Sequence, residues 1–171
     1  MTQCGQCGRE LGQHTLDVGF SLPDVVWNLD ERERKRRAWF SNDVCVLDKK
    51  RFFIRGVAFV SIVGTDQRFG WGLWAEVDPS AFKKYLDVFK VDARREAPVT
   101  GKVANSPRGY PALDGHGVDL QFGTASERPT MMLHACTHPL SLEQQQGIPM
   151  TRVHEINELV HRSAPDRGAD A

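Results

Sequence analysis

The sequence lacks the features that mark several large classes of protein. It has no excess of one charge, because 22 lysines and arginines balance 22 aspartates and glutamates. A neutral chain has no overall field that would draw it onto nucleic acid or an anionic membrane. No apolar run approaches the roughly 20 residues of a membrane-spanning helix, and the first residues lack the apolar core of a signal peptide. These absences predict a cytoplasmic protein that makes no contact with a membrane.

Catalytic signatures are absent as well. The 171 residues contain neither a phosphate-binding loop nor a dinucleotide-binding fingerprint. Cysteine is scarce, since the chain has only Cys4, Cys7, Cys45 and Cys136. A chain without an export signal keeps its thiols reduced, so metal binding or free thiols are expected in place of disulfides. The sequence favours a binding or interaction module, with a protein or small-molecule partner, over an enzyme.

Two long apolar runs joined by a polar turn dominate the middle of the chain, from Phe52 to Val77. The first run is apolar on both alternation faces, as in a central strand that is covered on both sides. In the second run, Gly70 and Gly72 occupy successive positions on one face. They leave a trough where another side chain or backbone can approach closely. The pattern predicts a central hairpin of two strands.

Arg55 is the one charge inside the first apolar run. A buried arginine is usually held by a carboxylate, although it can instead bind an anionic ligand. We expect a structural pairing, with the nearby candidates Asp48, Glu76 and Asp78. If function lies near the core, the place to look is where Arg55 meets the glycine trough.

The pattern of elements predicts an α+β fold with a mostly antiparallel sheet around the hairpin at about residues 52–77. Asp78 followed by Pro79 is a strong helix start, which predicts a packing helix near 79–90. A second amphipathic helix is expected near 150–162. Residues 1–162 are predicted to form a single domain with a Cys-x-x-Cys knuckle at its N-terminus. Residues 163–171 are predicted to be a disordered tail.

The knuckle consists of Cys4 and Cys7, separated by two residues and followed by a glycine. Two thiolates at this spacing bind one zinc ion, but tetrahedral zinc needs four ligands. No second knuckle is present, so isolated residues must complete the site. Cys45 is the candidate third ligand and His14 the candidate fourth. The alternative is a pair of thiols without metal.

A second group of candidate residues is His134, Cys136 and His138, which would share one face of a strand. The group suggests a metal-dependent or thiol-dependent hydrolase that uses Cys136 with one of the two histidines. Pro139 follows directly and is expected to end the strand and turn His138 away. Ordinary packing of these side chains is the alternative.

A run of charges from Arg32 to Arg37 follows the acidic pair Asp30 and Glu31. Acidic residues at the start and basic residues at the end match the dipole of a short surface helix. The run suggests weak nucleic-acid binding through phosphate contacts, whereas a solvated helix face is the ordinary interpretation.

Taken together, several short motifs resemble the bacterial family of unknown function DUF2199. Between residue 4 and about residue 160, the matching pieces are Cys4-x-x-Cys7-Gly8, the segment Asp43 to Asp48, the segment Phe52 to Gly56, Trp71-Gly72-x-Trp74, Gly109-Tyr110-Pro111, Arg128-Pro129, His138-Pro139-Leu140 and Gln146-Gly147-Ile148. The resemblance implies no established activity. Family members often carry a histidine where this chain has Leu11 and an acidic residue where it has Phe59. If that histidine holds metal in the family, His14 takes its place here.

Overall fold

The computed structural model describes residues 14–161, which contain eight strands and five helices. In chain order the elements are β1 (Asp17–Gly19), α1 (Asp24–Trp27), α2 (Glu31–Arg37), β2 (Ala38–Phe40), β3 (Val44–Leu47), β4 (Arg51–Ser61), β5 (Arg68–Val77), α3 (Pro79–Val88), β6 (Val99–Val103), β7 (Gly117–Gln121), β8 (Thr130–Leu133), α4 (Pro139–Gln146) and α5 (Met150–His161). The predicted α+β class is confirmed. The predicted tail 163–171 lies outside the described residues, and the single domain stays a prediction.

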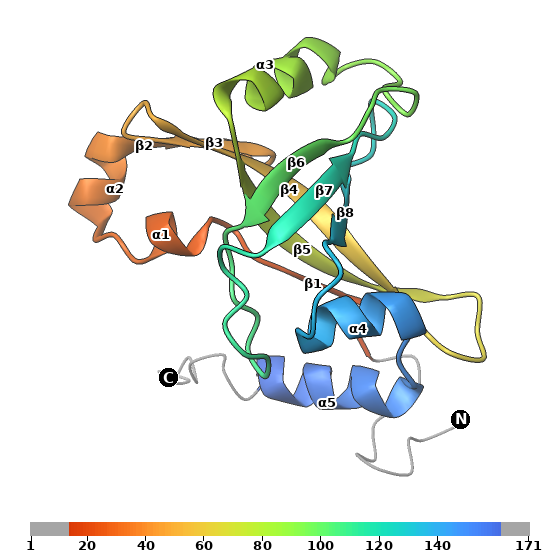
Figure 1. Ribbon diagram of the computed structural model, residues 1–171. Coiled ribbons are helices and arrows are strands. Elements are labelled where there is room, and N and C mark those ends of the chain that lie inside the picture. The colour runs from red at the N-terminus through yellow and green to blue at the C-terminus, as the bar shows by residue number, and fades with distance from the viewer. Residues whose placement is uncertain (1–13, 162–171) are drawn as a thin grey trace, which may run out of the picture.

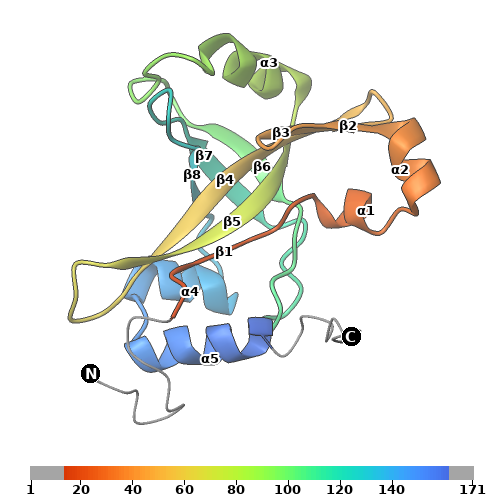
Figure 2. The same cartoon turned by 180° about the vertical axis from the view of Figure 1, so that it is seen from behind.

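Five strands close into a ring. β4 and β5 pair antiparallel from Phe52 opposite Val77 to Ser61 opposite Arg68, and β6, β7 and β8 follow as antiparallel neighbours. β8 then returns to β4 in parallel, with Val57 opposite Thr130. Figures 1 and 2 show the ring from opposite sides, with β2 and β3 extending outward from β4. The sequence pattern does not predict this closure.

The two faces of β4 have different roles. Ala58, Val60 and Ile62 point into the ring and belong to the main apolar core. On the outer face, Phe53 packs in a second apolar cluster with Leu22, Val26, Cys45, Leu47 and Trp74. The outer positions further along β4, beginning with Arg55, are partly exposed. The inner face of β4 is therefore covered along its length, whereas its outer face is covered only around Phe53, so the expected coverage on both faces holds for the first part of the strand alone.

The seam between β4 and β8 depends on Gly56 and Gln144. A Cβ atom at Gly56 would lie 2.8 Å from the carbonyl oxygen of Pro129 and 2.9 Å from two side-chain carbons of Met131. Beyond this close approach, the side-chain amide of Gln144 bridges the strands, donating 2.9 Å to the carbonyl of Met131 and 3.3 Å to that of Phe59. A side chain thus replaces backbone pairing where the two strands separate.

The helices cover the two ends of the ring, with α3 at one end and α4 and α5 at the other (Figure 1). The helices expected near 79–90 and 150–162 are α3 and α5, and the Asp78 carboxylate accepts a 2.7 Å bond from the Ala81 N–H as the predicted N-cap. Within residues 14–161, no helix is both long and apolar enough to cross a membrane.

Candidate functional site

Arg55 lies on the outer face of β4, beside the glycine trough. β1 pairs in parallel with β5, which places Asp17 opposite Gly70 and Gly19 opposite Gly72. A Cβ atom at Gly19 would lie 3.1 Å from Nη2 of Arg55, and one at Gly72 would lie 3.9 Å from it. The predicted close approach at the trough is confirmed. The absence of side chains at Gly19 and Gly72 lets the guanidinium lie across the two strands.

The predicted carboxylate partner of Arg55 is wrong, because all three candidates are engaged elsewhere. Asp48 pairs with Arg37 at 2.7 Å, Glu76 pairs with Arg51 at 2.7 Å, and Asp78 caps α3. Within the part of the chain that the structure describes, no carboxylate lies within 4.0 Å of the Arg55 guanidinium.

The polar contacts that Arg55 does make are few. Nη1 donates a long bond of 3.4 Å to the carbonyl of Asn42. Nε is shielded from solvent and has no hydrogen-bond partner among residues 14–161. The guanidinium lies 5.9 Å from the centre of the Trp74 ring, at the outer limit of a cation–π contact. A partly buried cation with so few partners is costly to the fold unless something else neutralises it.

Asp43 and Arg128 complete the local charge cluster. Nε of Arg128 donates 2.9 Å to Oδ1 of Asp43, and the N–H of Arg55 donates 2.9 Å to the carbonyl of Asp43. Burial and the neighbouring Arg128 lower the pKa of Arg55, while the Asp43 carboxylate partly offsets them. The one carboxylate of the cluster, Asp43, is thus bonded to Arg128 and not to Arg55. The excess positive charge can hold an anion.

The cluster adjoins two clefts that meet at Val57 and Arg128. One, of about 440 Å³, lies between α3 and the segment before β8, and Asp43, Tyr85 and Phe122 contribute to its walls. Burial raises the pKa of Tyr85 to about 12, so this phenol stays protonated at neutral pH. The 440 Å³ cleft thus combines the charged pair and the polar segment 123–127 with a few apolar side chains, such as Val57 and Phe122.

The second cleft, of about 520 Å³, has Phe59 and Arg68 in its lining. The Arg68 guanidinium stacks over the Phe59 ring at 3.9 Å. This contact adds another cation to the same face of the molecule.

The structure places the predicted zinc ligands as follows. Cys4 and Cys7 lie outside the described residues. Cys45 is fully buried in the outer apolar cluster, and burial raises the pKa of its thiol to about 12. Metal binding requires a thiolate, so these surroundings disfavour Cys45 as a ligand. His14 contacts the ring of His154 on α5. Among residues 14–161, no group of three potential metal-ligating side chains is present.

The three residues of the proposed hydrolase do not form one site. Nε2 of His134 contacts Asp119 at 2.8 Å on the surface. His138 is buried as the N-cap of α4, where its Nδ1 accepts the Leu140 N–H and its Nε2 contacts the carbonyl of Pro111 at 3.0 Å. Cys136 is exposed. The strand ends at Leu133, so the alternation that was expected to align the three side chains does not extend to them.

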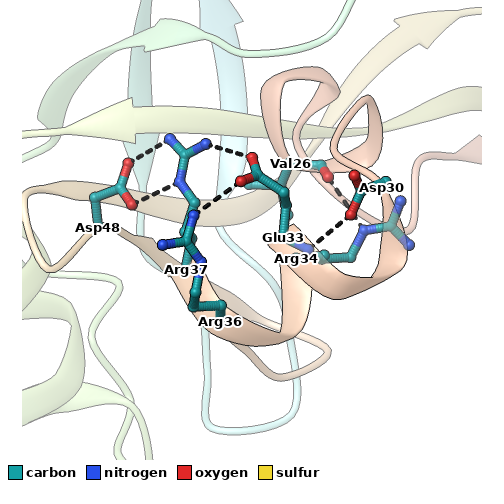
Figure 3. A network of polar contacts seen from close by, with 7 residues as sticks. All are labelled: Val26, Asp30, Glu33, Arg34, Arg36, Arg37 and Asp48. Atoms are coloured by element: carbon teal, nitrogen blue, oxygen red, sulfur yellow. Dashed lines mark hydrogen bonds and ion pairs between the residues drawn. The ribbon is translucent and has the colours of Figure 1, made fainter.

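The basic run forms α2 as expected, with Asp30 as N-cap. Figure 3 shows that most of its charges meet partners within the chain. Arg37 forms a two-bond contact with Asp48 and a third bond to Glu33, and Arg36 also contacts Glu33. Arg34 bonds to the carbonyls of Val26, Trp27 and Leu29. These contacts reduce the cationic surface that could meet a phosphate backbone.

The family described as "Uncharacterized protein conserved in bacteria (DUF2199)" matches residues 3–148. The chain belongs to this family. The resemblance stated from the motifs is therefore confirmed. No curated protein and no solved structure matches the chain. Membership of DUF2199 supplies no activity, so function has to be argued from the site itself.

Motifs that carried the resemblance to DUF2199 meet in space. Arg128 of the Arg-Pro motif pairs with Asp43. Tyr110 and His138, from two further motifs, stack with ring centres 6.0 Å apart. The sequence does not indicate which of these segments pair. The presence of Asp43 and Arg128 in the same set of family motifs is the signal that could have linked them.

Proposed function

We propose that the protein is a binding module for a small ligand that carries a carboxylate or phosphate group and acts in the cytoplasm. The observation that supports the proposal is the environment of Arg55. Its guanidinium is partly buried, and residues 14–161 supply it with one long carbonyl contact and no carboxylate. An arriving oxyanion would supply the hydrogen-bond acceptors that the fold leaves out.

The surroundings of Arg55 suit such a ligand. Gly19 and Gly72 leave room above the strands, and a planar guanidinium matches the geometry of a planar or tetrahedral oxyanion. Arg128 adds a second cation, while Asp43 fixes that cation in place. The second cleft, of about 520 Å³ and lined in part by Val57, Phe59 and Arg128, would receive the uncharged part of the ligand.

The test is thermal and chemical unfolding of the whole chain with increasing inorganic phosphate, for the native protein and for Arg55→Gln. At ten times its Kd, a ligand stabilises the fold by about 1.4 kcal/mol. We expect this gain in the native protein and its loss in Arg55→Gln. Arg32→Gln is the matched control, because it removes one exposed positive charge from α2. Equal responses of Arg55→Gln and the native protein would contradict the proposal.

The structure adds no observation in favour of the two alternative functions that were raised from the sequence. For a hydrolase at Cys136, the two candidate histidines are already in contact with other groups. His134 contacts Asp119, and His138 contacts the carbonyl of Pro111. The cations of α2 that would bind nucleic acid instead contact Glu33, Asp48 and backbone carbonyls. Anion binding at Arg55 is therefore the function that the geometry supports best.

A further inference from the structure

A carboxylate lies at the opposite end of the glycine trough from Arg55. Strands β1, β5 and β4 run side by side, as Figure 2 shows, and Asp17 of β1 is the register partner of Gly70. Oδ1 of Asp17 lies 2.7 Å from the point where a Cβ atom at Gly70 would lie. The carboxylate therefore reaches from β1 into space that a side chain on β5 would otherwise fill.

The Asp17 carboxylate forms no hydrogen bond and no ion pair with any residue in the range 14–161. The bonds that Asp17 does form there use its backbone. The hydroxyl of Thr15 donates 2.8 Å to the Asp17 carbonyl, and the Asp17 N–H donates 3.3 Å to the same hydroxyl oxygen. The trough is thus flanked by a guanidinium and a carboxylate that do not pair with each other.

The distance between these two charges suits a small zwitterion. Nη2 of Arg55 lies next to Gly19 and Gly72, whereas Oδ1 of Asp17 lies next to Gly70. Positions two residues apart on a strand are separated by about 6.6 Å, so the two charges are offset by about 7 Å along the strands. Charge-assisted hydrogen bonds are about 2.8 Å long. One such bond at each end leaves space for an ammonium group and a carboxylate that are joined through a single carbon atom.

We propose that the ligand of the Arg55 site is an α-amino acid, whose carboxylate binds Arg55 and whose ammonium group binds Asp17. This inference rests on the proposed anion site and narrows its ligand from any oxyanion to a zwitterion. The α-carbon would lie over the trough, where Gly70 and Gly72 present no side chains. A single molecule would then supply partners to both charges, which inorganic phosphate does not do.

The side chain of the amino acid would lie against Val57 and Phe59. Cγ1 of Val57 and Cε1 of Phe59 lie 3.1 Å and 3.5 Å from the same Cβ position at Gly70 that Asp17 approaches. Both residues also line the cleft of about 520 Å³. The Arg68 guanidinium, which stacks over the Phe59 ring at 3.9 Å, favours an aromatic side chain in this cleft, because a guanidinium stacks well on aromatic rings.

The first test compares L-phenylalanine with 3-phenylpropionate, which lacks the ammonium group, and with phenethylamine, which lacks the carboxylate. Calorimetric titration of the whole chain measures each Kd, with inorganic phosphate titrated in parallel. We expect L-phenylalanine to bind about tenfold more tightly than 3-phenylpropionate, because a hydrogen bond to a charged group contributes that much. Phenethylamine should bind most weakly, since it leaves Arg55 without an acceptor.

Equal affinity for L-phenylalanine and 3-phenylpropionate would overturn the amino-acid inference. If phosphate still binds through Arg55 in that case, the anion site itself stands. Absence of binding by phosphate and by both carboxylates would instead contradict the proposed function together with the inference.

The second test is the variant Asp17→Asn, which should fold normally because the carboxylate is exposed. Its affinity for L-phenylalanine should fall about tenfold, to that of 3-phenylpropionate, whereas its affinity for 3-phenylpropionate should not fall. Asp66→Asn is the matched control, because it removes one exposed negative charge from the turn between β4 and β5. Native affinity for L-phenylalanine in Asp17→Asn would exclude Asp17 as the ammonium partner and overturn the inference.

Discussion

Helix α2 and strand β4 present positive charge in opposite ways. On α2, Arg36 and Arg37 are bound by Glu33 and Asp48, and Arg34 is bound by three backbone carbonyls. On β4, Arg51 at the start of the strand pairs with Glu76, but Arg55 lies inside the apolar run with one long contact to the Asn42 carbonyl. Among residues 14–161, most basic side chains of α2 have partners, whereas Arg55 has only the long contact to Asn42 and a distant aromatic ring.

This difference shows that the number of charges is a poor guide to a binding site. Arg37 and Asp48 come from elements that are adjacent in the fold, so each serves the other. Asp43 is bonded to Arg128 and acts on Arg55 only through its charge, and one carboxylate does not neutralise two guanidinium groups. A ligand is needed where the fold itself supplies too few partners.

The comparison depends first on the rigidity of the strand that carries Arg55. We expect Gly56→Ala to destabilise the fold by about 1–3 kcal/mol, because the new methyl group overlaps the Pro129 carbonyl and the Met131 side chain. Urea denaturation measures this loss. Ser61→Ala, at an exposed position on the same strand, should stay within about 0.5 kcal/mol of the native protein.

A Gly56→Ala variant as stable as Ser61→Ala would show that β8 does not approach β4 as closely as described. The packing of β4 against β8 would then be too weak to hold Arg55 in the position that the proposal requires. Anion binding in Gly56→Ala should weaken along with stability, because the seam and the site share β4 and the segment around Arg128.

The α2 side of the comparison predicts a smaller effect. Arg37→Ala removes two bonds to Asp48 and one to Glu33 from a partly exposed network, so the loss of stability should be measurable but below that of Gly56→Ala. Arg32→Ala, an exposed neighbour on the same helix, is the control and should have no effect. Denaturation of both variants at neutral pH tests the difference.

The same pair gives a dependence on pH. The hydrogen bonds from Arg37 lower the pKa of Asp48 in the folded state. Its contribution is therefore complete above the unfolded value of about 3.9 and is lost as the pH falls through the lower folded value. The native protein and Arg37→Ala should converge in stability below about pH 4. A difference that persists unchanged to pH 2 would show that Arg37 stabilises the fold by packing alone.

Local sequence signals predicted the elements around the hairpin well. Strict apolar patterning identified β4 and β5, and the Asp78-Pro79 start identified α3, because both depend on neighbouring residues. Closure of the ring was missed because Val57 and Thr130 are far apart in sequence and meet at a single pairing.

The site was predicted only in part, for a similar reason. Arg55 is recognisable from the sequence as a charge in an apolar run, and Gly70 and Gly72 predict that another part of the chain approaches the strand closely. Its partners depend on the three-dimensional fold, which assigns Asp48 and Glu76 to other arginines. Asp43 and Arg128 lie 85 positions apart, and no local pattern links them. Local chemistry thus identified the cation, but not that it has no carboxylate partner among the residues that the structure describes.

The most direct test of the central claim is the stability of Arg55→Met, measured by urea denaturation with and without phosphate. If Arg55 serves a ligand, its apolar replacement removes an under-satisfied buried charge, so stability without phosphate should equal or exceed that of the native protein. The stabilisation by phosphate should then be lost. A loss of more than about 1 kcal/mol without phosphate, together with a native response to phosphate, would contradict the account and make Arg55 a structural residue.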